Sequence, residues 1–272
     1  MNPFFLILPS LCYLAVAALL LRQVHRGINL NKRLSLKWKL FALSLFAIVW
    51  HAGALYQNII QNQGIDFSLA QVSSLIAWWV SLLLLVSNLR NPTDNLGILV
   101  FPLAAIASLM PIFFPSVTTI QTLSQFMSLH ILLSILSYSM LSLTAAQAIL
   151  TTIQEKLLRQ HHPGNLTRAF PPLQTMEKLL FSHIRLGFYL LSLSLISGLL
   201  ITHNVMDQHL SHKIFFSTLA WLVFGILFWG HQVQGWRGQR INRWILAGFF
   251  FLLISYFGSK LVLEVLQPVF HG

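Results

Sequence analysis

Histidine is the residue type in this chain best suited to chemistry, because eleven histidines stand beside only six acidic residues. His51 and His130 lie within long apolar stretches, and His203 follows a third one. Counted along the helices that these stretches predict, the three imidazoles come to one side of a membrane, whereas His231 ends a helix on the other side. These four histidines are the candidate site.

The neighbours of His130 and His51 at helical spacing are small or carry hydroxyl groups. Small and hydroxyl side chains on apolar helices face neighbouring helices and not lipid, so both imidazoles are expected to point into a helix bundle. The residues that share these two faces are Ser134, Ser137, Tyr138 and Ser142 with His130, and Ser44, Ala47, Ala54 and Asn58 with His51. Two interpretations stay open, namely a histidine hydrogen-bonded to its neighbours and a metal ligand.

A buried imidazole tends to be neutral, because removal from water disfavours the imidazolium, and neutral imidazole is the form that binds metals. No carboxylate accompanies the cluster, which disfavours Mg²⁺ or Mn²⁺, and no thiolate does either. Haem iron with axial histidines suits an apolar slot between helices better than a bare ion does. We interpret His130 and His51 as haem-iron ligands, and His203 and His231 as further haem contacts.

The remaining histidines are expected outside the bundle. His161 and His162 lie in a polar loop and should be solvated. An interfacial position is expected for His25, His183, His209, His212 and His271.

Several functional classes are excluded by what the sequence lacks. It contains no phosphate-binding Walker loop, no GxSxG elbow and no HExxH motif, and its acids are too scattered for a paired-carboxylate hydrolase. We therefore expect no enzyme. Cys12 is the one cysteine, so an intrachain disulfide and a CxxC site are both excluded. Despite the net charge of +11, no soluble basic patch with interleaved aromatics exists, and nucleic acid is not an expected partner.

The composition determines which elements position these residues. Hydrophobic residues make up 56% of the chain and charged residues 8%, and the mean hydropathy is +0.72. A helical crossing needs about 20 apolar residues, and unpaired backbone groups are not tolerated in hydrocarbon. The chain is therefore predicted to be a single all-α polytopic membrane domain, 1–272, with eight transmembrane helices. They are expected near 1–21, 38–60, 66–90, 185–202, 213–231 and 242–263, with two more in 95–154 that Pro111 and Pro115 separate.

The positive charges predict the topology. The loops after the first, third, fifth and seventh helices hold fifteen of the seventeen Lys and Arg residues, and only Lys213 and Lys260 fall on the other side. Positive loops face the cytoplasm, so both termini are expected on the outer, periplasmic side. The loop at about 155–184, between the fifth and sixth helices, is then cytoplasmic.

Several segments resemble the cytochrome c assembly (CcsA/CcmC) superfamily of membrane proteins, and in particular its short eight-helix members of YpjD or HemX type. The resemblance covers nearly the whole chain. The segments that carry it are Trp50-His51-Ala52, Leu129-His130-Ile-Leu-Leu-Ser-Ile-Leu-Ser-Tyr138, Pro171-Pro-Leu-Gln-Thr-Met-Glu177, Leu-Ser-Leu-Ser-Leu-Ile-Ser-Gly198, Trp229-Gly-His231-Gln-Val-Gln-Gly-Trp-Arg-Gly-Gln-Arg240 and Ser255-Tyr-Phe-Gly258.

The resemblance implies a multi-pass protein of the bacterial inner membrane that binds or passes haem. Residue by residue, it implies that His130 is the outer-side haem ligand, and it matches His51, His203 and His231 to histidines of the eight-helix pattern. The partners that it implies are the lipid bilayer, haem and other cytochrome or haem assembly membrane proteins.

One departure from the family concerns the tryptophan-rich WWD loop, which presents haem at the outer surface in the haem-delivery members. Between the sixth and seventh predicted helices this chain has only 203–213, a segment without tryptophan. The resemblance therefore implies haem binding, transport or sensing within the membrane more than ligation to cytochrome c. Two other functions remain open: a small-solute or metal-ion transporter, and a non-catalytic scaffold or regulator of haem metabolism.

Overall fold

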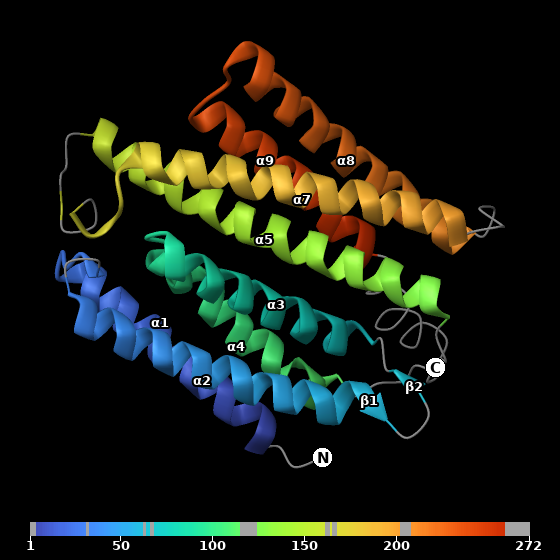
Figure 1. Cartoon of the computed structure of the whole chain (residues 1–272), viewed down its shortest axis with the longest axis horizontal. Coiled ribbons are helices and arrows are strands. Elements are labelled where there is room, and N and C mark those ends of the chain that lie inside the picture. The colour runs from blue at the N-terminus through green and yellow to red at the C-terminus, as the bar shows by residue number, and fades with distance from the viewer. Residues whose placement is uncertain are drawn as a thin grey trace. The chain divides into compact units, whose positions relative to one another are not determined.

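The computed structural model of the chain is almost entirely helical (Figure 1). In the part of the chain that the structure describes, eight helices are long and apolar enough to cross a membrane, which confirms the predicted polytopic all-α class. One candidate residue, His203, lies outside the described residues. The structure describes residues 4–30, 33–61, 64–65, 68–114, 124–160, 164, 168–201 and 208–258.

The helices follow the apolar stretches of the sequence closely. A 3-10 turn at Asp94–Leu96 precedes α4, a π-helical turn at Ile254–Gly258 continues α9, and the short strands β1 (Ile60–Gln61) and β2 (Gly64–Ile65) pair antiparallel after α2. The helices are α1 (Phe4–His25), α2 (Leu34–Ile59), α3 (Leu69–Arg90), α4 (Gly97–Phe113), α5 (Gln125–Arg159), α7 (Leu173–Ile201), α8 (Gln208–Gln234) and α9 (Gln239–Leu253).

The chain forms two compact units, and each has its own core. Unit 1 comprises Met1–Gln121 and Ile149–Leu179, and unit 2 comprises Thr122–Ala148 and Leu180–Gly272. In unit 1, α1 packs against α2 and α4, and α3 packs against α2 and α4. In unit 2, α8 packs against α9, and a buried apolar cluster joins residues of α5, α7, α8 and α9.

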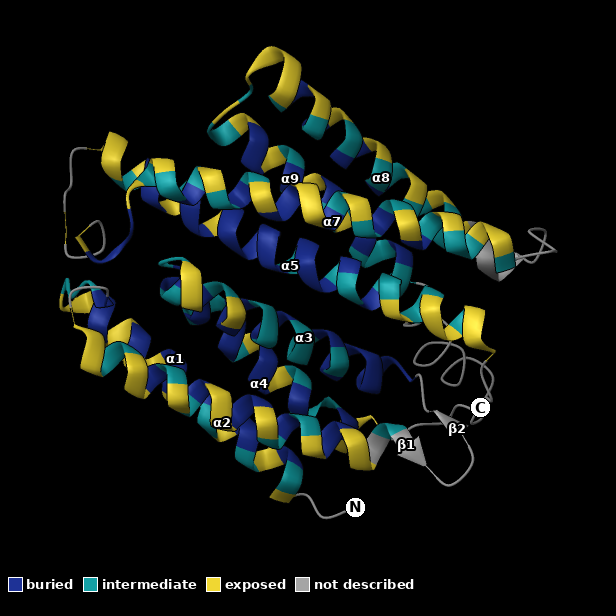
Figure 2. Cartoon of the chain, viewed as in Figure 1, coloured by how far each residue is buried: buried dark blue, intermediate teal, exposed yellow. Residues whose placement is uncertain are grey.

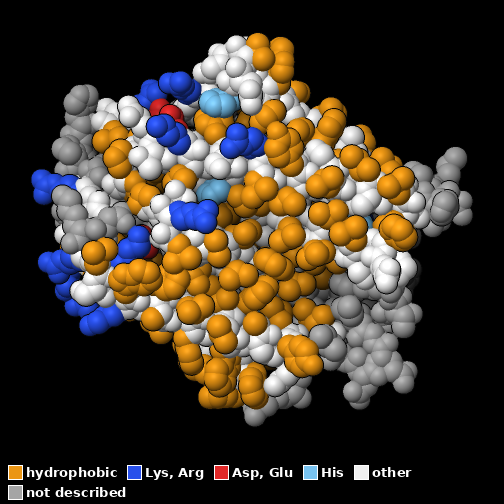
Figure 3. Space-filling model, viewed as in Figure 1, with side chains coloured by type: hydrophobic (Ala, Val, Ile, Leu, Met, Phe, Trp, Pro, Cys, Tyr) orange, Lys and Arg blue, Asp and Glu red, His pale blue; other side chains and the backbone are white. Residues whose placement is uncertain are grey.

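Large apolar side chains also cover the outside of the helices. Leu103 is 64% exposed and Ile106 is 63% exposed in unit 1, and Leu199 is 60% exposed in unit 2. Figure 2 shows buried and exposed residues along the same helices, and Figure 3 shows a visible face that is mainly hydrophobic. Such a surface suits lipid, because lipid tails are as apolar as these side chains.

The connection between α5 and α7 is shorter than the predicted loop at 155–184. Helix α5 continues to Arg159, whose guanidinium donates to the Glu155 carboxylate one turn earlier at 2.7 Å. Helix α7 begins at Leu173, directly after Pro171 and Pro172. Charged residues can belong to a helix that protrudes from the bilayer, so the first and last charges of a loop do not mark helix ends. The sixth predicted helix therefore starts about three turns too late.

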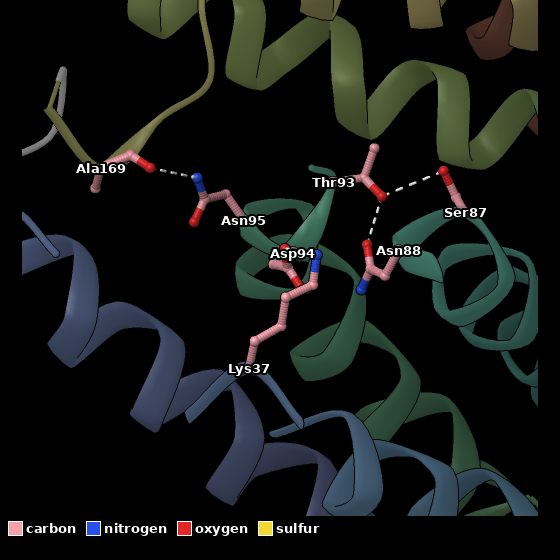
Figure 4. A network of polar contacts seen from close by, with 7 residues as sticks. All are labelled: Lys37, Ser87, Asn88, Thr93, Asp94, Asn95 and Ala169. Atoms are coloured by element: carbon pink, nitrogen blue, oxygen red, sulfur yellow. Dashed lines mark hydrogen bonds and ion pairs between the residues drawn. The ribbon is translucent and has the colours of Figure 1, made fainter. Parts of the chain in front are cut away.

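A polar network gathers at one end of unit 1 (Figure 4). The Lys37 ammonium lies 3.6 Å from the Asp94 carboxylate, and the Asn95 side-chain amide donates to the Ala169 carbonyl at 3.1 Å. Thr93 bonds Ser87 and Asn88 at the end of α3. The network joins the first turn of α2, the connection between α3 and α4, and the segment that precedes α7. These three segments thus lie together at one end of unit 1.

We expect Asn95→Ala to loosen this end of unit 1. The substitution leaves the buried Ala169 carbonyl without its donor, which costs about 1–2 kcal/mol. Limited trypsin digestion should then cut faster at Arg168 than in the wild type. The control is Asn91→Ala, which removes a side-chain amide from the same connection. That amide bonds no buried carbonyl of the described residues. Equal cleavage rates for both variants would show that the Asn95 bond does not stabilise this end of unit 1.

Candidate functional site

The imidazole of His130 is held by the C-terminal part of α7 within unit 2. Its Nδ1 lies 3.1 Å from the Ser194 carbonyl oxygen and 3.0 Å from Ser197 Oγ. The Ser197 hydroxyl donates to the same carbonyl at 2.9 Å. A carbonyl oxygen only accepts, so Nδ1 carries the hydrogen and shares it between the two oxygens. The lone pair of this neutral imidazole is therefore on Nε2.

This arrangement is the one that metal-binding histidines adopt. Such histidines donate the N–H of one ring nitrogen to a carbonyl or carboxylate, which fixes the tautomer and leaves the other nitrogen for the metal. Among the described residues, none bonds Nε2 of His130. The side chain is half-buried. His130 thus fits an iron ligand by its own geometry.

Gly198 allows the ring of His130 to lie directly against the backbone of α7. A Cβ atom at this position would come within 2.9 Å of Cε1 of the imidazole. A second contact between α5 and α7 lies beside the His130 ring. The Ser134 hydroxyl donates to the His130 carbonyl at 2.8 Å and bonds Ser194 Oγ at 2.7 Å. The face of α5 that the sequence predicts to point inward does contact a neighbouring helix here.

His51 lies at the centre of unit 1 and is fully buried. Its Nδ1 shares a 3.3 Å hydrogen bond with the Tyr13 hydroxyl of α1, and its Nε2 shares a 2.9 Å bond with Ser74 Oγ of α3. Tyr13 also stacks on Phe101 of α4, with ring centroids 5.7 Å apart. The side chain therefore ties α2 to α1 and α3, and both of its nitrogens are engaged.

His231 lies near the end of α8, at the opposite end of unit 2 from His130. Its Nδ1 donates to the Trp236 carbonyl at 3.0 Å, so Nε2 again holds the lone pair. The imidazole stacks on Phe181 of α7 with a centroid separation of 3.3 Å. Phe181 and Ser194, which hold the two histidines, are thirteen residues apart on α7, or about 20 Å. His130 and His231 cannot bind the same iron.

His183 is a buried polar residue that the sequence interpretation placed at the interface. It is 7% exposed and lies within α7, where Nδ1 donates to Gln147 Oε1 of α5 at 2.7 Å. The expectation is wrong because it followed from starting the helix at Arg185. The Pro171-Pro172 pair was the signal available in the sequence, since proline is favoured at helix starts.

The candidate histidines therefore fall into separate places. His51 belongs to unit 1, and His130, His183 and His231 belong to unit 2. In the described part of the chain, no three His, Cys, Asp or Glu side chains gather as a bare metal ion would require.

Comparisons with known proteins place these residues in a family context. The model of the family described as cytochrome C assembly protein matches residues 38–267. The chain is 31% identical to the inner membrane protein YpjD of Escherichia coli (strain K12) over 237 residues, which are 85% of this chain and 89% of that protein. It is 22% identical to protein HemX of Brevibacillus brevis over 80% of this chain and 83% of that protein.

A third relative matches a shorter part of the chain. The cytochrome c biogenesis protein CcsA of Guillardia theta is 26% identical over 152 residues, which are half of each chain. No solved structure matches.

Proposed function

Because the chain belongs to the cytochrome c assembly protein family, we propose that it is an inner-membrane protein that binds haem and passes it on. The name of its Escherichia coli relative supports the location, and the name of its Guillardia theta relative supports a place in cytochrome c biogenesis. The chain performs binding and transfer, and makes or breaks no covalent bond of the haem. Its partners are the bilayer and other haem or cytochrome assembly membrane proteins.

The single observation that carries this proposal is the state of His130. Its Nδ1 hydrogen is shared by a backbone carbonyl and a hydroxyl, and no described residue occupies its Nε2. Haem supplies an iron that accepts one or two axial nitrogen ligands. His130 would hold that iron through Nε2, while Ser194 and Ser197 keep the ring in position.

The other candidate histidines have different support. His231 has the same tautomer and an Nε2 that no described residue bonds, which suits a contact for haem at the opposite end of unit 2. His51 would have to release Tyr13 or Ser74 before it could bind iron. His203 follows the same stretch of chain as Ser194 and Ser197, and it keeps its predicted role as a contact on the His130 side.

The absorption spectrum of the wild-type protein tests the proposal. The protein is expressed with excess haem precursor, purified in detergent and titrated further with haem. A saturable Soret band at a stoichiometry of at least one haem per chain is expected. A spectrum that matches haem in empty detergent micelles at every ratio would refute haem binding.

Gly198→Ala is expected to weaken haem binding about tenfold without unfolding the protein. The new methyl group occupies the place of the His130 ring, so the imidazole must leave Ser194 and Ser197, and loss of such supporting bonds costs about 10–100-fold in metal affinity. Haem titration measures the effect. Gly53→Ala, where a Cβ meets nothing within 4 Å, is the control. Equal haem affinity in the two variants would show that Gly198 does not position His130.

A further inference from the structure

The turn between α8 and α9 presents three exposed arginines at one end of unit 2 (Figure 1). Arg237 lies in the turn itself, and Arg240 and Arg243 lie in the first two turns of α9. They are three of the five Lys and Arg residues in the described part of unit 2. None of the three pairs with a carboxylate of the described residues. Positive charge is therefore concentrated in one short segment of this unit.

Contacts with the end of α8 hold this segment in place. The Trp236 backbone N–H donates to the Gly230 carbonyl at 3.2 Å, and the Trp236 carbonyl accepts from His231 Nδ1 at 3.0 Å. The Trp236 ring packs directly on Gly230, where a Cβ atom would come within 2.7 Å of it. The guanidinium of Arg240 lies over this ring, 4.8 Å from its centroid. A cation–π contact thus positions Arg240 on a ring that is fixed to α8.

The exposed face of α9 changes from charged to apolar along the helix. Its exposed residues are Arg240, Arg243, Ala247 and Phe250, and their spacing of three, four and three residues places them on one face. Phe250 is 58% exposed and lies about 10 Å further along the helix than Arg243. The opposite face packs into the buried apolar cluster of unit 2, for example through Ile245.

This face also lies where the surface of a bilayer is expected. The helices on both sides of the turn are long and apolar enough to cross a membrane, and the turn between them comprises only residues 235–238. The arginines therefore lie close to the bilayer surface. The rings of Trp236 and Trp244 are 6.1 Å apart beside them, and tryptophan is enriched at the level of the lipid headgroups.

We propose that this face, which comprises Arg237, Arg240, Arg243, Ala247 and Phe250 and is called the arginine face below, binds an anionic phospholipid. The guanidinium groups bind the headgroup phosphate, because their planar fork matches the geometry of phosphate oxygens. An acyl chain of the same lipid lies along the apolar part of the face. A soluble anion or an acidic peptide would use the cations alone, whereas a phospholipid matches both parts. The inference does not depend on haem binding.

Native mass spectrometry of the full chain in detergent tests the proposal, because it resolves each bound lipid. Phosphatidylglycerol and phosphatidylcholine with the same acyl chains are titrated into the wild type and two triple variants. The arginine-face variant is Arg237→Gln/Arg240→Gln/Arg243→Gln. The control removes the same charge from exposed arginines of unit 1 and is Arg22→Gln/Arg26→Gln/Arg90→Gln.

The wild type is expected to bind its first phosphatidylglycerol at least about tenfold more tightly than phosphatidylcholine, because each basic residue near an anionic lipid contributes about fivefold in affinity. The arginine-face variant should bind both lipids equally, and the control should keep the preference of the wild type. Glycerophosphoglycerol, which is the same headgroup without acyl chains, should compete far more weakly than phosphatidylglycerol, since it cannot use the apolar part of the face.

Three results would overturn the lipid site. The first is an arginine-face variant that keeps the preference for phosphatidylglycerol. The second is an equal loss in both triple variants, because the preference would then follow net charge alone. The third is competition by glycerophosphoglycerol or by an oligoglutamate peptide that is as strong as competition by phosphatidylglycerol, which would assign the arginines to a soluble anion or to an acidic protein.

Melting temperatures in detergent control for unfolding, and they should be equal in the three proteins because the substituted side chains are exposed. If the arginine-face variant melts earlier than the control, the single variant Arg243→Gln replaces it. Its affinity for phosphatidylglycerol should be about fivefold weaker than that of the wild type, with unchanged affinity for phosphatidylcholine. An unchanged affinity for phosphatidylglycerol in Arg243→Gln would contradict the proposal.

Discussion

A His130→Ala variant is expected to lose more than about 100-fold in haem affinity. Removal of the hydrogen-bond partner of a metal-binding histidine costs about 10–100-fold in affinity, and removal of the ligand itself must cost more. The imidazole contacts Ser194 and Ser197 through Nδ1 alone, so its loss leaves the rest of unit 2 largely unchanged. Haem titration followed by the Soret band measures the affinity.

Two matched variants make this result specific. Ser197→Ala removes one acceptor of the Nδ1 hydrogen and should reduce affinity by about tenfold. His25→Ala, at the end of α1, should have no effect. Free imidazole added to His130→Ala should restore part of the Soret band. A His130→Ala protein that binds haem as tightly as the wild type would remove His130 from the site.

His51→Ala is expected to give the largest loss of stability among the histidine variants. Three side chains from three helices meet at this fully buried position, and the truncation leaves the Tyr13 hydroxyl and Ser74 Oγ without their shared partner. Hydrogen bonds between membrane helices average about 0.6 kcal/mol, and the cavity left by the ring adds to their loss. We expect a total of about 2–4 kcal/mol. Thermal unfolding of the haem-free protein in detergent measures it.

Val49→Ala on the same helix is the control, because Val49 is 62% exposed and its methyl groups face outward. Equal melting temperatures for the two variants would show that the buried bonds of His51 contribute little. If His51→Ala kept its stability but lost haem, His51 would be an iron ligand and not a hydrogen-bonded centre of unit 1. A hydrogen-bonded His51 thus predicts a loss of stability in His51→Ala, whereas an iron-binding His51 predicts a loss of haem binding with stability retained.

The helices and their approximate bounds followed from the sequence, because the bilayer imposes a simple physical requirement. Each crossing needs about 20 apolar residues with internally bonded backbone, and the described residues contain eight such stretches. The prediction failed at the start of α7, where Glu177 and Lys178 belong to the helix although they are charged. The hydrocarbon boundary limits where charges lie, but it does not limit where a helix begins.

The sequence by itself determined that His51 and His130 would face other helices, since their neighbours at helical spacing are small or hydroxylic. Only the tertiary structure decided what they meet. Tyr13 and Ser74 lie 38 and 23 residues from His51 along the chain, and Ser194 lies 64 residues from His130. Helical periodicity gives the direction of a side chain but not the neighbouring helix, its depth or its rotation. For that reason the Nε2 of His130, which no described residue bonds, and the engaged nitrogens of His51 could be distinguished only from the packed helices.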